Sequence, residues 1–124
     1  MRYVEVWEII YNAIKDNNLL AGCFNYDPKT IEQFPTAIVL PADLNSVILD
    51  TTSNNNLIWY KIRISDQNTN LEVTEARVRA VCDSILENLD TIPQIISKNI
   101  VWGWTDDEQP MRVCEINVVY RCVI

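Results

Sequence analysis

The sequence predicts an α+β fold: a two-layer sandwich in which two helices pack on one face of an antiparallel β-sheet. Two helical patterns alternate with groups of strand patterns, and the longest strands are apolar on one face only. The chain has 124 residues, of which 48% are hydrophobic, which suits one core, and it contains no repeat or linker. We therefore expect a single domain over residues 1–124.

The first helix is expected between Arg2 and Asn17, because polar residues recur there at three- and four-residue spacing. The apolar residues of this segment fall on the opposite side and form a core-facing stripe: Val6, Trp7, Ile10, Ala13 and Ile14. Residues 22–33 contain Asp27-Pro28, a turn signal, so we expect an irregular connection with room for one small extra element.

Two short strands are expected in the middle of the chain. The run Thr36–Leu40 lies between two prolines, which permit an extended segment before them but cannot donate to a sheet. A second strand is expected at Ser46–Asp50, and the asparagine-rich residues 51–56 predict an exposed loop.

Two longer strands alternate strictly between apolar and polar positions. In residues 57–65 one face carries Ile58, Tyr60, Ile62 and Ile64, and the other carries Trp59, Lys61 and Arg63. In residues 111–124 one face is an unbroken apolar row of Cys114, Ile116, Val118, Tyr120, Cys122 and Ile124. The polar positions of this last strand include Glu115, Asn117 and Arg121. One face of the sheet is therefore expected to be buried.

The second helix is expected between these strands. Thr69-Asn70-Leu71-Glu72 predicts a capping box, in which Thr69 and Glu72 satisfy backbone donors reciprocally. Its apolar stripe is expected to consist of Thr74, Val78, Val81, Cys82, Ile85 and Leu89. Pro93 ends this helical region, and a further strand is expected at Ile100–Trp104.

Composition excludes several classes of function. A formal charge of −7 argues against non-specific binding to nucleic acid or to anionic lipid, and no apolar run is long enough to span a bilayer. The absence of histidine excludes Ser–His and Cys–His nucleophile pairs and His-containing metal sites. Two glycines leave no phosphate-binding loop. We expect no cofactor, no metal and no catalytic residues.

The four cysteines are expected to be reduced thiols of a protein made in the cytoplasm. None of them forms a C-x-x-C pair, and the chain does not open on an apolar signal segment. Cys114 and Cys122 point to the same side of one strand, roughly 26 Å apart at about 3.3 Å per residue, so they cannot pair with each other. We expect both to fill the core.

Two groups of residues are candidate functional sites. Trp102 and Trp104 precede Asp106, Asp107 and Glu108, which suggests sugar stacking beside carboxylates, although an exposed acidic turn between two strands explains the same residues. The other group is the stripe formed by Trp59, Lys61 and Arg63, which Arg121 and Asn117 extend. This stripe suits a subunit or partner interface, nucleic-acid stacking or local packing, and the negative net charge favours the interface.

The order of these elements resembles that of the tail terminator (tail completion) proteins of long-tailed bacteriophages and of related minor tail and neck proteins. An N-terminal helix leads through Phe34-Pro35-Thr36-Ala37-Ile38-Val39 to a hairpin that ends in the alternating strand Ile58–Ile64. A helix with the apolar stripe Val78–Leu89 and a strand pair that ends with Val113–Val123 complete the pattern. The resemblance covers nearly the whole chain.

The resemblance implies a structural virion protein of the tail and neck that forms a homohexameric ring on the tail tube. Such a ring ends tube polymerisation, contacts the major tail tube protein and presents a surface to the head-side connector or stopper protein. DNA passes through the lumen without specific binding, and Asp106, Asp107 and Glu108 are candidates either to line that lumen or to face a partner. A ring needs two different complementary patches, and Trp59, Lys61, Arg63 and Arg121 are candidates for subunit or tube contact.

Three other hypotheses fit the same sequence. One is another neck, head-closure or minor tail protein. A second is a small carbohydrate-binding or hydrolytic domain that uses Trp102, Trp104 and Asp106–Glu108. A third is a cellular adaptor domain that binds a peptide at its sheet edge.

Overall fold

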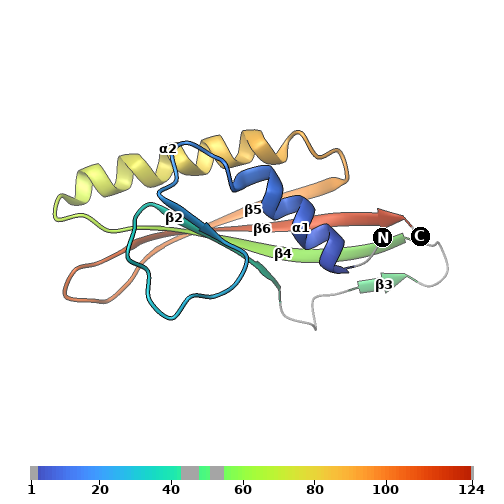
Figure 1. Ribbon diagram of the computed structural model, residues 1–124, viewed down its shortest axis with the longest axis horizontal. Coiled ribbons are helices and arrows are strands. Elements are labelled where there is room, and N and C mark those ends of the chain that lie inside the picture. The colour runs from blue at the N-terminus through green and yellow to red at the C-terminus, as the bar shows by residue number, and fades with distance from the viewer. Residues whose placement is uncertain (1–2, 43–47, 51–54, 124) are drawn as a thin grey trace.

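The computed structural model describes residues 3–42, 48–50 and 55–123, which form two layers. One layer is a β-sheet, and the other consists of α1 (Tyr3–Ile14) and α2 (Leu71–Leu89), which lie on the same side of that sheet (Figure 1). Side chains from both helices and from the sheet share one core. The predicted α+β sandwich with two helices on one sheet face is confirmed.

The described strands form one sheet in the order β1-β2-β4-β6-β5, and β3 pairs separately with β4. Their bounds are β1 (Gly22–Phe24), β2 (Thr36–Pro41), β3 (Ile48–Asp50), β4 (Asn55–Asp66), β5 (Ile95–Trp104) and β6 (Arg112–Val123). The long strands β4 and β6 pair from Asn55↔Val123 to Asp66↔Arg112 and form the centre of the sheet. All described pairs are antiparallel except β1–β2, which is parallel, so the sheet is mixed rather than wholly antiparallel.

Two strands differ from the sequence prediction. β1 is the small extra element within the connection before β2, and it is held by its register with β2, from Gly22↔Thr36 to Phe24↔Ile38. β5 begins at Ile95, well before the predicted start at Ile100. A register shift between Ile95 and Ser97 interrupts the alternation at the start of this strand, so the sequence pattern does not reveal it. Ser46, Val47 and residues 51–54, which belong to the predicted second strand and loop, lie outside the described residues.

The predicted capping box is wrong by one residue. Asn70, rather than Thr69, is the N-cap of α2, and its side-chain oxygen accepts hydrogen bonds from the backbone N–H groups of Glu72 (3.0 Å) and Val73 (3.3 Å). Glu72 is then the second helical residue rather than the third, a position from which its carboxylate cannot complete a capping box.

The core follows the alternation that the sequence predicts. All six residues of the predicted α2 stripe are buried, and so are the alternate residues Ile58–Ile64 of β4 and Cys114–Tyr120 of β6. α1 contributes Val6, Ile10 and Ile14 at full burial, one helical turn apart. The indole N–H of Trp7 donates to the carbonyl oxygen of Val39 at 2.9 Å and fixes α1 against β2. The side chain of Cys122 lies outside the described residues.

Candidate functional site

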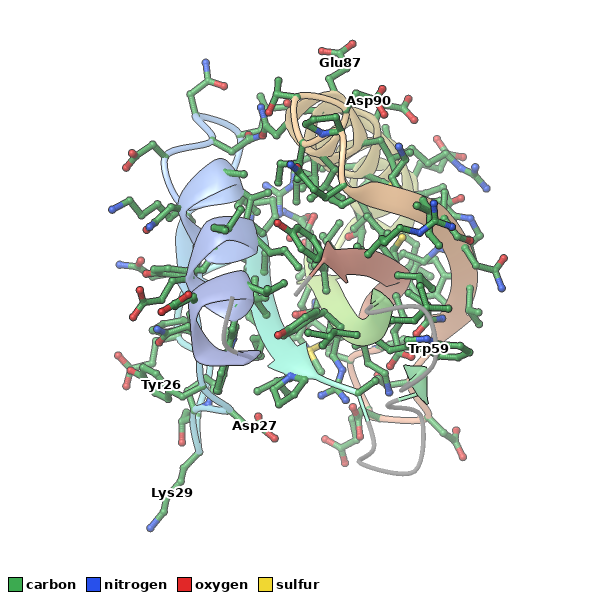
Figure 2. The ribbon with its side chains drawn as sticks, turned by 90° about the vertical axis from the view of Figure 1, so that its right-hand side faces the viewer. Tyr26, Asp27, Lys29, Trp59, Glu87 and Asp90 are labelled. Atoms are coloured by element: carbon green, nitrogen blue, oxygen red, sulfur yellow. The ribbon has the colours of Figure 1, made fainter. Side chains whose placement is uncertain are left out.

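The sheet face opposite the helices carries the stripe Trp59, Lys61 and Arg63, in the orientation that the alternation predicts. These side chains are partly exposed, whereas the intervening residues of β4 point into the core. In Figure 2 Trp59 lies on the side of the molecule away from α1. Neither helix covers this face, so we call it the open face.

Among the described residues of the open face, two cations share one carboxylate. Glu115, opposite Arg63 on β6, lies 3.4 Å from Arg63 Nε and 3.6 Å from Lys61 Nζ, measured to its two carboxylate oxygens. One carboxylate therefore serves two cations. All three side chains are about one-third exposed, at 35% for Lys61, 37% for Arg63 and 28% for Glu115. Exposed pairs of this kind contribute little to stability and remain available to another carboxylate.

A hollow of about 450 Å³ lies on the open face beside this stripe. It crosses the strands from β4 to β5 and is lined by Ala42, Trp59, Lys61, Ser97, Asn99, Asn117 and Val119. The indole nitrogen of Trp59 is buried and finds no hydrogen-bond acceptor among the described residues. Arg121 is exposed and pairs in register with Leu57, which places it on the same face as the stripe.

The acidic residues Asp106, Asp107 and Glu108 form an exposed turn between β5 and β6. The turn is closed by Thr105, whose backbone N–H donates to Met111 O at 2.9 Å and whose hydroxyl accepts from Met111 N–H at 2.8 Å. Glu108 shares a shallow hollow with residues just before α2, so the turn lies at the end of the molecule where α2 begins. It is a separate surface from the open face.

Trp102 and Trp104 do not stack over a cleft lined by these acids. Arg79 and Arg112 lie over the Trp102 ring, with guanidinium-to-centroid distances of 4.7 and 4.9 Å, and Arg112 also lies 5.2 Å from the centre of the Trp104 ring. These arginines occupy the ring faces that a sugar would need. Among the described residues, Trp104 lines a wide, shallow depression together with Arg112, Glu72 and Glu75.

Sequence reasoning missed the polar cluster around Arg112. This side chain is only 10% exposed, and its Nε lies 2.6 Å from Glu75 Oε2. Arg79 Nε lies 2.6 Å from the other carboxylate oxygen of Glu75. Burial destabilises the charged form of Glu75 and by itself raises the pKa of this carboxyl. The hydrogen bond from Arg79, the positive charges of Arg112 and Arg79, and a smaller hydrogen-bond contribution from Arg112 together outweigh burial and lower the pKa. The signal was present in the alternation, because Arg112 continues the inward row that begins at Cys114.

Within the described part of the chain, no group of three or more Cys, Asp or Glu side chains is arranged to hold a metal ion. Neither α1 nor α2 has the length and apolar character needed to cross a membrane. No protein-family model and no curated protein significantly matches this chain.

Proposed function

We propose that the protein is a structural virion component of a long-tailed bacteriophage, a tail terminator that caps the tail tube as a homohexameric ring. The observation that carries the proposal is the open face, where an indole and two cations lie on a sheet surface that no helix covers. The resemblance in element order supports the same function. The ring ends tube polymerisation and offers its free side to the head-side connector.

Ring closure requires two different patches that complement each other on neighbouring subunits. The open face supplies one patch, with Lys61, Arg63 and Arg121 as its cations. The acidic turn supplies an exposed patch of opposite charge at the α2 end of the molecule. Because these patches lie on different surfaces of one subunit, each is free to contact a different neighbour. We propose that the acidic turn of one subunit contacts the open face of the next.

The charge of the chain suits a ring through which DNA passes. Seventeen acidic residues against ten basic ones give a net charge of −7. Carboxylates near the lumen would repel phosphate over a Debye length of about 8 Å at physiological ionic strength, so DNA is not retained. The wall of the ring needs no catalytic group for this function.

Electron microscopy of the purified protein mixed with isolated tail tubes tests the proposal. We expect caps at one end of the tubes and a halt to the addition of further tube subunits. The variant Arg63→Glu should reduce the fraction of capped tubes at least tenfold, because it reverses a cation on the open face. Lys29→Glu is the matched control: Lys29 extends into solvent away from this face (Figure 2), so this variant should cap normally. Bare tube ends with the unaltered protein would refute the proposal.

A further inference from the structure

Two buried thiols meet between α2 and β6. Cys114 Sγ donates a hydrogen bond to Cys82 Sγ at a sulfur–sulfur distance of 3.5 Å, although 32 positions separate the two residues in the chain. Cys82 is 1% exposed and Cys114 is fully buried. A disulfide requires an S–S distance of about 2.05 Å, so the sulfurs need to approach each other by only about 1.5 Å.

The surroundings of the two thiols favour one of them as the nucleophile. The hydrogen bond from Cys114 and the nearby charge of Arg79 lower the pKa of Cys82, against the effects of burial and of Asp83. The same hydrogen bond, together with burial, raises the pKa of Cys114. Cys82 is therefore the thiol with the greater thiolate character, and Cys114 lies within reach as the resolving thiol.

We propose that Cys82 and Cys114 are an oxidisable pair that forms an intramolecular disulfide on exposure to peroxide. The Cys82 thiolate attacks one peroxide oxygen and breaks the O–O bond, which gives a sulfenic acid at Cys82 and releases hydroxide. The Cys114 sulfur then attacks the Cys82 sulfur, the S–O bond breaks, and the proton of Cys114 leaves with the oxygen as water. Overall, two thiols are oxidised and one hydrogen peroxide is reduced to two waters.

The disulfide would bind α2 to the central strand of the sheet. Cys82 lies in the buried stripe of α2, and Cys114 lies on β6, which pairs with both β4 and β5. A cross-link between these positions removes conformational freedom from the unfolded chain, which raises the melting temperature. The proposal does not depend on the function of the assembled protein, because it concerns the core of a single subunit.

The test compares reduced protein with protein treated with hydrogen peroxide, the remaining thiols being blocked with N-ethylmaleimide under denaturing conditions. We expect the intact mass to show two fewer maleimide adducts and the loss of two hydrogens. A non-reducing digest should yield one cross-linked species that joins the Cys82 and Cys114 peptides. Dithiothreitol should reverse both changes. The cross-linked form should melt roughly 10 °C higher than the reduced form.

Cys23 provides the matched control, since burial and the charge of Asp16 raise its pKa to about 11 and it lies on β1. Cys23→Ala should keep the cross-link, whereas Cys82→Ala and Cys114→Ala should abolish it. The digest of the unaltered chain needs no variant, so misfolding of an alanine variant does not prevent the test. Recovery of Cys82 as a maleimide adduct, as a sulfinic acid or in a disulfide with Cys122 would overturn the proposal, and so would an unchanged melting temperature.

Discussion

Arg77 donates two hydrogen bonds to Asp66 and so connects α2 to the end of β4. Arg77 Nε donates to Asp66 Oδ2 at 2.7 Å, and Arg77 Nη2 donates to Asp66 Oδ1. Asp66 is fully buried, whereas the Arg77 side chain is 39% exposed. The backbone N–H of Gln67 also donates to Asp66 Oδ1, at 2.9 Å. Among the described residues, Arg77 is the cation that lies within ion-pair distance of this buried carboxylate.

Replacement of Arg77 by methionine should lower the free energy of unfolding by about 3 kcal/mol, because it leaves the Asp66 carboxylate buried without a cation. Urea denaturation measures this loss. Arg79→Met is the control on the same helix, since Arg79 is 56% exposed and its ion-pair partner Glu75 and the Trp102 ring beneath it are both partly exposed. Its cost should stay below about 1 kcal/mol. If Arg77→Met and Arg79→Met lower the free energy of unfolding equally, the ion pair with the buried Asp66 is no stronger than the exposed pair with Glu75.

The N-cap of α2 gives a second prediction. Asn70→Ala removes the acceptor for the backbone N–H groups of Glu72 and Val73 and should cost about 1 kcal/mol. Thr69→Ala should have an effect within about 0.5 kcal/mol, because Thr69 precedes the cap. If Thr69→Ala instead costs more unfolding free energy than Asn70→Ala in thermal or urea unfolding, Thr69 is the N-cap and the predicted capping box is correct.

Glu75 should make stability depend on pH in the acidic range. The pKa of Glu75 is lowered from its ordinary value of 4.5, so its stabilising contribution is complete above that value and is lost as pH falls through the lower folded-state pKa. Unfolding of the unaltered chain and of Glu75→Gln should differ by a constant amount, less than about 1 kcal/mol, above roughly pH 5. The difference should shrink as the pH falls below 4.5 and through the lowered folded-state pKa of Glu75. If the difference between the two chains does not change as the pH is lowered, protonation of Glu75 is not its cause.

A charge exchange tests the proposed contact between subunits. Reversal of the acidic turn by Asp106→Lys and Asp107→Lys, placed in the same chain as Arg63→Glu, restores opposite charges across the proposed interface. Ring formation on tail tubes should then recover at least tenfold relative to Arg63→Glu alone. Circular dichroism should first show that each variant is folded. If the combined variant then forms no more rings than Arg63→Glu alone, the acidic turn does not contact the open face, and the proposal that it faces the lumen remains.

The predicted element order and core stripes are correct because burial imposes a regular period. The six-residue stripe of α2 and the alternation in β4 and β6 were readable residue by residue. β1 was not predicted as a strand, because its three residues pair only with the distant β2 and carry no local pattern. The sequence did not reveal the early start of β5, because the irregularity at Ile95–Ser97 breaks the alternation of apolar and polar residues that predicts a strand.

The sequence alone determined which side chains face the core, because helices and strands have fixed periods and water excludes apolar groups. It thus placed Trp59, Lys61 and Arg63 together on the outer surface of the sheet. Only the tertiary structure decided that Arg112 lies against Trp102 and Trp104, and that Cys82 meets Cys114. The thiol contact joins a helix and a strand 32 positions apart in the chain and depends on how α2 is set across the sheet. The Arg112 contacts depend on the register in which β6 pairs with β5, and no local period contains either geometry.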